Sequence, residues 1–276
     1  MLSSAREHYV RQQRVSTAGV VAARKAWADG SGRVARVVAA FQILVARDAA
    51  AAVDAMLAEQ GISDPPDGTV AVAALAGIAS DGRALDTLFD QAVSSFQFGL
   101  MVATQLQDAA RAAASVSIAS RNRVGYVRML NPPSCSRCVI LAGKWFGWNE
   151  GFRRHPLCDC RHIPTTENVA HDLTTNPDTY FRSLSAAEQN KIFTEDGAQA
   201  IRDGADMSQV VNARSGMSTA QIGGRDALVT TTGTTRRSAT GRRLGKRPRI
   251  MPETIYKIAA DRADAQRLLR LYGYIL

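Results

Sequence analysis

The stretch that decides the fold is residues 121–165, RNRVGYVRMLNPPSCSRCVILAGKWFGWNEGFRRHPLCDCRHIPT. Five side chains in it could bind a metal ion: Cys135, Cys138, His155, Cys158 and Cys160. The chain of 276 residues has four cysteines, and all four are in this stretch. Four cysteines are too few for a disulfide-dense secreted scaffold of this length. Their close grouping instead indicates one local metal site.

Zinc is the metal that this spacing favours. It takes four sulfur or nitrogen ligands at tetrahedral corners, with sulfur at about 2.3 Å. A C-x2-C turn brings Cys135 and Cys138 together, and three candidates remain for two places. We favour Cys158 with either His155 or Cys160. The C-x-C spacing argues mildly against Cys158 and Cys160 binding one metal together, because such side chains diverge in an ideal strand unless the chain bends. We therefore expect a structural Zn²⁺; disulfides and inert buried thiols stay open as alternatives.

The residues around the cluster predict a small mixed element. Val124, Tyr126 and Val127 indicate a short strand that ends at the Asn-Pro-Pro of residues 131–133. A short helix is expected from Ser136 to Leu141, closed by Gly143. Residues 144–152 look irregular, and 160–164 look like a second strand or extended piece. The centre is thus a small α+β element stapled by a Cys/His cluster.

Residues before the centre predict long helices. Apolar side chains recur with helical spacing over 3–28 and again over 33–60. Alanine-rich segments at 69–79 and 83–114 predict two further helical regions. His8, alone on a polar helix, is expected to be a solvated surface histidine. The fold class is therefore mostly α, with an Ala-rich helical N-terminal region.

Helices are expected to return after Pro164. Ser185 and Glu188 form a capping-box pattern before a helix toward residue 193, and Asp206 can cap another. Further helices are expected at 197–203, 252–258 and 261–271, and a low apolar content predicts an extended arm over 228–249. The domains implied are 1–120, a helical region; 121–215, the Cys/His core with its following helices; and 216–276, the basic arm with C-terminal helices.

Positive charge is concentrated in the last quarter of the chain. The net charge is +9, and residues 201–276 carry 14 basic and 6 acidic groups, a net of +8. The basic side chains of the arm are Arg236, Arg237, Arg242, Arg243, Lys246, Arg247 and Arg249. Flexible cationic arms bind phosphate backbones without reading sequence, so double-stranded DNA and an acidic protein surface are the expected partners. No aromatic residue interleaves the arginines, which disfavours stacking on single strands.

The sequence shows no segment of membrane or signal-peptide type. It has no run of 18 or more apolar residues, and its first residues, MLSSAREHYVRQQR, lack an apolar core. We therefore expect no transmembrane helix and a protein that is made and kept in a cytoplasm.

The motif around the cluster resembles the phage Mu F-like minor head family. The matching run is C-x2-C-x2-L-x-G, then H-P-x-C-x-C-x3-P, at Cys135, Cys138, Leu141, Gly143, His155, Pro156, Cys158, Cys160 and Pro164. This specific motif and its intervening stretch cover about 30 residues. The preceding GYVRML is also similar to the family. Looser similarity to actinobacteriophage relatives extends over AIRDGADMSQVVNARSGM, TTTGTTRRS and MPETIYKIAADRADAQRLLRLYGY.

The resemblance implies a head morphogenesis protein rather than an enzyme. Related genes usually lie between those for the portal and the scaffold. Such a protein acts in host cytoplasm during assembly, and then inside the capsid near the portal, in a few copies. The expected partners are the portal protein, the scaffold, the major capsid protein and double-stranded DNA.

Two other functions stay open. Relatives are also labelled capsid maturation protease, and His162 or His171 could serve as the base for a serine nucleophile. The candidate nucleophiles are Ser134, Ser183, Ser185 and Ser215, but none lies in a G-x-S-x-G elbow. A zinc-dependent DNA-binding protein is the third reading, which the net charge of −1 over residues 131–200 (7 basic, 8 acidic) disfavours.

Overall fold

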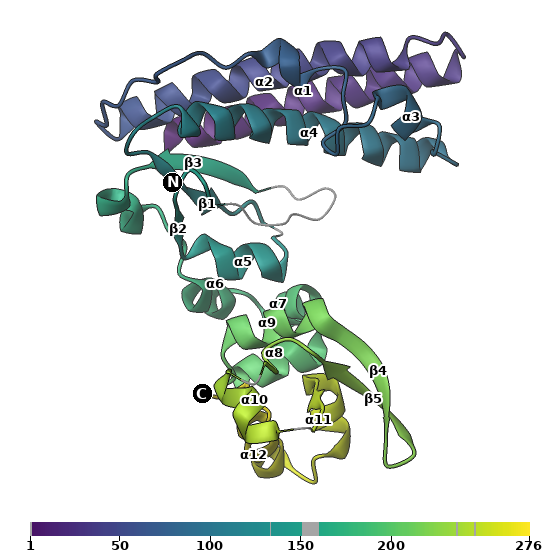
Figure 1. The fold of residues 1–276 in the computed structure, drawn as a ribbon, viewed down its shortest axis with the longest axis vertical. Coiled ribbons are helices and arrows are strands. Elements are labelled where there is room, and N and C mark those ends of the chain that lie inside the picture. Colours follow the sequence, from purple (N-terminus) through teal and green to yellow (C-terminus); the bar gives the residue numbers. More distant parts are fainter. Residues whose placement is uncertain (1, 133, 151–159, 236, 246) are drawn as a thin grey trace. The chain divides into compact units, whose positions relative to one another are not determined.

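The computed structural model describes residues 2–132, 134–150, 160–235, 237–245 and 247–276. The described chain is mostly helical, as expected from the sequence, and contains two small three-stranded sheets, of which the second was not predicted (Figure 1). It divides into two compact units. Unit 1 comprises Met1–Asn131 and Lys144–Thr174, and unit 2 comprises Pro132–Gly143 and Thr175–Leu276.

Unit 1 is built on three long helices that lie side by side (Figure 1). They are α1 (Ser3–Ala28), α2 (Val34–Glu59) and α4 (Ser95–Ala119). The first two confirm the helices predicted at 3–28 and 33–60. Their core is fully buried at Val38, Val45, Phe98 and Leu106. Gly19 permits close packing, because a Cβ there would lie 2.6 Å from the Leu106 Cδ1 atom.

The alanine-rich segment between α2 and α4 is less helical than predicted. The helix predicted at 69–79 is wrong, since only the 3₁₀ turn η1 (Val72–Leu75) forms there. The predicted 83–114 helix is broken into α3 (Leu85–Phe89) and α4. Gly77 and Gly82 adopt positive φ values of 80° and 86°, which interrupt the helical backbone. The segments on either side of these glycines are too short to offset the free-energy cost of helix nucleation.

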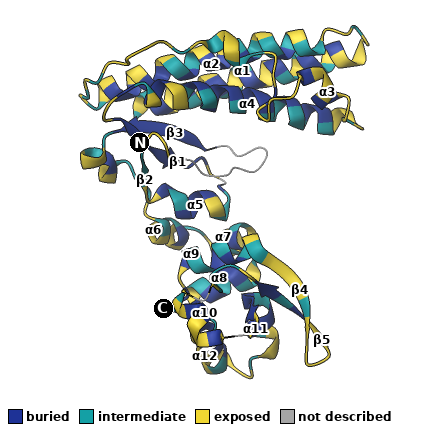
Figure 2. Cartoon of the chain, viewed as in Figure 1, coloured by how far each residue is buried: buried dark blue, intermediate teal, exposed yellow. Residues whose placement is uncertain are grey.

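The first sheet completes unit 1. Its order is β2-β1-β3, all antiparallel, with β1 (Gly125–Met129) between β2 (Trp145–Phe146) and β3 (Arg161–Thr165). Both longer strands are buried throughout (Figure 2). They pack on α1 and α2 through a cluster that includes Ala5, Ala52, Met56, Val127, Met129 and Ile163. The two predicted strands are confirmed, whereas β2 lies where irregular structure was expected. The 3₁₀ turn η2 (Glu167–Asp172) follows β3.

Unit 2 consists of short helices. They are α5 (Ser136–Ala142), α6 (Pro177–Ser183), α7 (Ala186–Phe193), α8 (Glu195–Arg202), α9 (Met207–Ala213), α10 (Ala239–Leu244), α11 (Pro252–Ile258) and α12 (Arg262–Leu271), with the 3₁₀ turn η3 (Arg214–Gly216). Side-chain caps begin most of them: Cys135, Asn176, Ser185, Thr194, Asp206, Ser238 and Asp261. The predicted capping box of Ser185 with Glu188 is confirmed.

The second sheet belongs to unit 2 and has the order β4-β5-β6. Its strands are β4 (Met217–Ile222), β5 (Arg225–Thr230) and β6 (Arg249–Ile250). Gly223 and Gly224 join β4 to β5 with φ values of 58° and 76°, which a two-residue type I′ hairpin turn requires. Val229, Ile250, Met251, Ile255, Leu269 and Tyr274 form the buried cluster beneath it.

The extended arm predicted over 228–249 is wrong, because this segment folds as the end of β5, α10 and β6. Hydrogen bonds of Arg249 stabilise this segment, which has few apolar side chains. Its fully buried guanidinium donates to the carbonyls of Thr232, Tyr272 and Gly273 at 2.8–2.9 Å. It also lies over the Tyr274 ring, 4.2 Å from the centroid.

The two units do not coincide with the predicted domains 1–120, 121–215 and 216–276. The central segment is shared, since its strands belong to unit 1 and α5 belongs to unit 2. The apolar residues of β1 and β3 complete the helical core of unit 1, whereas α5 packs with α6 and α9.

Among the helices that the structure describes, none is both long and apolar enough to cross a membrane.

Candidate metal centre and basic surface

The Cys135–Cys138 turn forms the N-terminal end of α5. Cys135 is the N-cap, with an extended backbone at φ −70° and ψ 156°. Its Sγ atom accepts a hydrogen bond from the Cys138 backbone N–H at 3.4 Å. The two sulfurs lie 3.3 Å apart, and Cys138 is buried. The sequence thus correctly predicted that this spacing brings the two thiols together.

This pair fits one half of a zinc site. Two Zn–S bonds of about 2.3 Å at a tetrahedral angle place sulfurs about 3.8 Å apart. The observed 3.3 Å is about 0.5 Å shorter than that value and well beyond the about 2.05 Å of a disulfide bond. The Cys138 backbone N–H, which donates to the Cys135 Sγ atom, is also the kind of donor that supports a thiolate.

Of the other three ligand candidates, the structure describes Cys160 alone. Cys160 is buried in unit 1, immediately before β3. His155 and Cys158 lie outside the described residues. Within the described ranges, no group of three or more His, Cys, Asp or Glu side chains gathers as a metal site requires. The structure therefore brings together Cys135 and Cys138 of the five candidates.

The basic residues of the predicted arm have unequal access to a partner. Arg237, Arg242, Arg243 and Arg247 are exposed. Arg242 and Arg243, both on α10, donate to the carbonyls of Arg237 and Arg270. Arg236 and Lys246 lie outside the described residues. The four exposed side chains are therefore carried by folded structure rather than by an extended tail.

Arg249 is removed from the predicted binding set by its burial. It is 0% exposed, and burial lowers the pKa of its guanidinium from the ordinary value. Its donors are used by backbone carbonyls of the same unit. A phosphate group has no access to it, so its role is structural.

His8 is not the solvated residue that the sequence predicted. It is 4% exposed, and its Nδ1 atom lies 2.7 Å from the Asp48 Oδ2 atom. Asp48 also accepts hydrogen bonds from Arg11 and Gln12, which joins α1 to α2. Burial raises the pKa of Asp48, but these hydrogen bonds outweigh it and hold the pKa well below its ordinary value. The missed signal was long-range, because Asp48 lies 40 residues away.

The residues proposed for a protease have local structural contacts. His162, in unit 1, is buried against the Tyr126 ring with centroids 4.1 Å apart. His171 is exposed and paired with Asp172 at 3.0 Å. In unit 2, Ser134 is buried, and the hydroxyls of the other three candidates donate within their own segments. Their acceptors are Tyr180 O for Ser183, Glu188 Oε2 for Ser185 and Asn212 O for Ser215.

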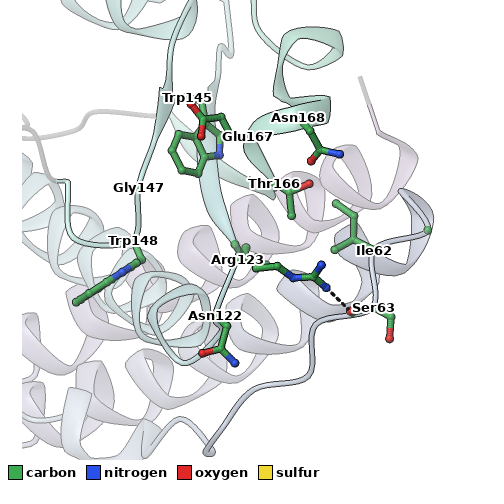
Figure 3. A pocket seen from close by; sticks show the side chains of 12 residues that line it. Ile62, Ser63, Asn122, Arg123, Trp145, Gly147, Trp148, Thr166, Glu167 and Asn168 are labelled. Atoms are coloured by element: carbon green, nitrogen blue, oxygen red, sulfur yellow. Dashed lines mark hydrogen bonds between the residues drawn. The ribbon is translucent and has the colours of Figure 1, made fainter.

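A pocket of about 820 Å³ in unit 1 was not predicted (Figure 3). Trp145 and Trp148 line it on one side, and Trp148 is 58% exposed. Arg123, Thr166 and Asn168 supply polar groups, and Arg123 Nη2 donates to the Ser63 carbonyl at 3.4 Å. The pocket suits a polar ligand with an apolar face. Its one sequence signal was the pair of nearby tryptophans.

No family model, no curated protein and no solved structure matches this chain.

Proposed function

We propose that this chain is a phage minor head protein of the Mu F-like kind, which acts near the portal in head assembly, DNA packaging or ejection. The observation that supports the proposal is the Cys135–Cys138 turn at the start of α5. It lies at the beginning of the motif that resembles this family, six residues after the end of the β1 segment GYVRM.

The proposed site is structural. Cys135 and Cys138 would supply two ligands, and His155, Cys158 and Cys160 are the candidates for the other two. A bound zinc ion would crosslink segments that have too little apolar surface to fold alone. The protein's own task is then placement against the portal. Arg237, Arg242, Arg243 and Arg247 are the side chains available for double-stranded DNA or an acidic surface.

The zinc site is tested by metal analysis of the purified chain. About one zinc per chain is expected, because four ligands saturate a structural site. Cys138→Ser should lose the zinc and unfold the centre, whereas Ser136→Ala, two residues away and not a ligand candidate, should keep both. A wild-type chain purified without zinc, or a folded and functional metal-free Cys138→Ser protein, contradicts the site.

The head function is tested by co-expression. The intact masses of the phage's major capsid and scaffold proteins should be unchanged by this chain, and the portal protein should co-purify with it. Shortening of either protein that disappears in His162→Ala or His171→Ala would replace the proposal with a capsid maturation protease. Failure to bind the portal protein would remove placement at the portal.

A further inference from the structure

Strand β4 presents an open sheet edge. In the described part of the chain it pairs only with β5, on one side, and the hairpin projects from the helices of unit 2 (Figure 1). Five of its six residues are exposed (Figure 2). Its sequence, MSTAQI, contains no charged residue and no proline. Proteins usually protect such edges with lysine, proline or a bulge, so an unprotected edge is a template for another strand.

The first sheet offers no comparable edge. Its edge strand β2 has two residues, and β3 is buried along all five of its positions. Strand β6 is also two residues long. Among the described strands, β4 is therefore the one with length and exposure sufficient for pairing.

The hairpin register decides which backbone groups of β4 face outward. Ile222 and Arg225 flank the two-residue turn, and in a type I′ hairpin this pair exchanges both backbone hydrogen bonds. Antiparallel pairs alternate between bonded and non-bonded. The backbone N–H and C=O groups of Thr219 and Gln221 and the C=O of Met217 therefore point away from β5, whereas the Met217 N–H donates to the Arg214 carbonyl.

We propose that β4 pairs antiparallel with β4 of a second copy of this chain, across a two-fold axis at Thr219. In this register the two Thr219 residues exchange both backbone hydrogen bonds, and the Gln221 N–H of each copy can donate to the Met217 carbonyl of the other. Thr219 lies opposite itself, and cross-strand threonine pairs are favourable. No like charges meet, since β4 has none. The edge is thus complementary to itself, which argues for a second copy as its partner.

The proposal is independent of the phage function, because it rests on the sheet edge alone. It predicts a continuous six-stranded sheet made from two three-stranded ones. The test is therefore made on the full chain alone, without any partner.

Cysteine crosslinking tests the register. Hydrogen-bonded pairs place Cα atoms about 5.5 Å apart, within the 4.4–6.8 Å that a disulfide spans. Thr219→Cys should form a crosslinked dimer under mild oxidation, beyond the level given by the native cysteines. Gln221→Cys is the matched control, because its two copies would lie about 13 Å apart along the strands. Equal crosslinking of both variants, or none of Thr219→Cys, overturns the register.

Charge reversal tests the association. Light scattering should show a concentration-dependent dimer for the wild-type chain. Thr219→Lys and Thr219→Glu should each weaken it by at least about tenfold, because identical charges then meet at the axis. Mixing the two variants should restore the dimer, which a folding defect would not do. A wild-type monomer at high concentration, as expected if β4 serves a different protein, or variants that associate as before, overturns the proposal.

Discussion

The two units reach a buried core by different means. Unit 1 packs long helices around side chains such as Phe98, which is stacked on Trp27 with centroids 5.1 Å apart and meets Phe89 edge-on. Unit 2 has short helices with side-chain caps. Both units bury arginines, Arg128 of unit 1 among them, but Arg249 of unit 2 donates to three backbone carbonyls. The comparison shows that a segment poor in apolar residues can still fold when one polar side chain satisfies several backbone carbonyls.

The largest expected effect comes from Arg249→Met, which keeps an unbranched side chain but removes the donors to three carbonyls. The free energy of unfolding of unit 2 should fall by about 3–5 kcal/mol, because buried carbonyls lose their partners. Hydrogen exchange over β5 and α12 measures it. All three tryptophans lie in unit 1, so tryptophan fluorescence follows that unit separately.

The control is Arg247→Met, two residues away and exposed, which should change stability by less than about 0.5 kcal/mol. If the two substitutions lower the free energy of unfolding equally, the buried Arg249 stabilises unit 2 no more than a surface arginine does. That result would contradict the contrast between the two units.

A smaller effect is expected from Asp48→Asn in unit 1, where polar contacts supplement the apolar core. Losing a charged acceptor of bonds from His8, Arg11 and Gln12 should cost about 2 kcal/mol at pH 7. Because the folded-state pKa of Asp48 is lowered, its stabilisation is complete above the unfolded pKa of about 3.9. It is lost as the pH falls below that value toward the folded pKa.

Thermal melts followed by tryptophan fluorescence from pH 7 to pH 3 measure this dependence. The difference between wild type and Asp48→Asn should shrink toward acid pH. Glu59, whose pKa is lowered to about 2 by hydrogen bonds from Ser4 and Ser3, adds acid sensitivity to both proteins and so cancels in the difference. A difference that is constant with pH would contradict the assignment.

The smallest effect is expected from Ser185→Ala, which removes the N-cap of α7. A lost capping box should cost about 1 kcal/mol and raise hydrogen exchange over the first turn of α7. Ser183→Ala is the control, because its hydroxyl donates only to the Tyr180 carbonyl within α6. If the two variants have the same stability and the same hydrogen exchange, the side-chain caps do not stabilise unit 2 as proposed.

Local signals in the sequence were sufficient for much of the fold. Periodicity located α1 and α2 within one or two residues, and caps located α7 and α9. The segment 228–249 was misjudged, because Arg249 is bound by carbonyls 17 to 24 residues away, outside any local window. The high alanine content led to a prediction of too much helix between α2 and α4, because alanine content does not indicate where the backbone turns.

The candidate site was predictable to a similar degree. The C-x2-C spacing correctly indicated that Cys135 and Cys138 meet, because four residues in a turn determine their separation. The pairing of His8 with Asp48 and the pocket beside Trp148 depend on contacts between distant segments. A single sequence contains no direct signal for such contacts.

The place of α5 in the chain has a consequence for synthesis on the ribosome. This helix belongs to unit 2 but is made before β2 and β3, with which the chain returns to unit 1. Its Arg137 contacts Asn212, which is translated 75 residues later. At 5–20 residues per second that delay is about 4–15 s. Until α6 and α9 are made, α5 lacks these packing partners, so we expect the nascent chain to offer chaperones a short apolar helix that carries Val139 and Ile140.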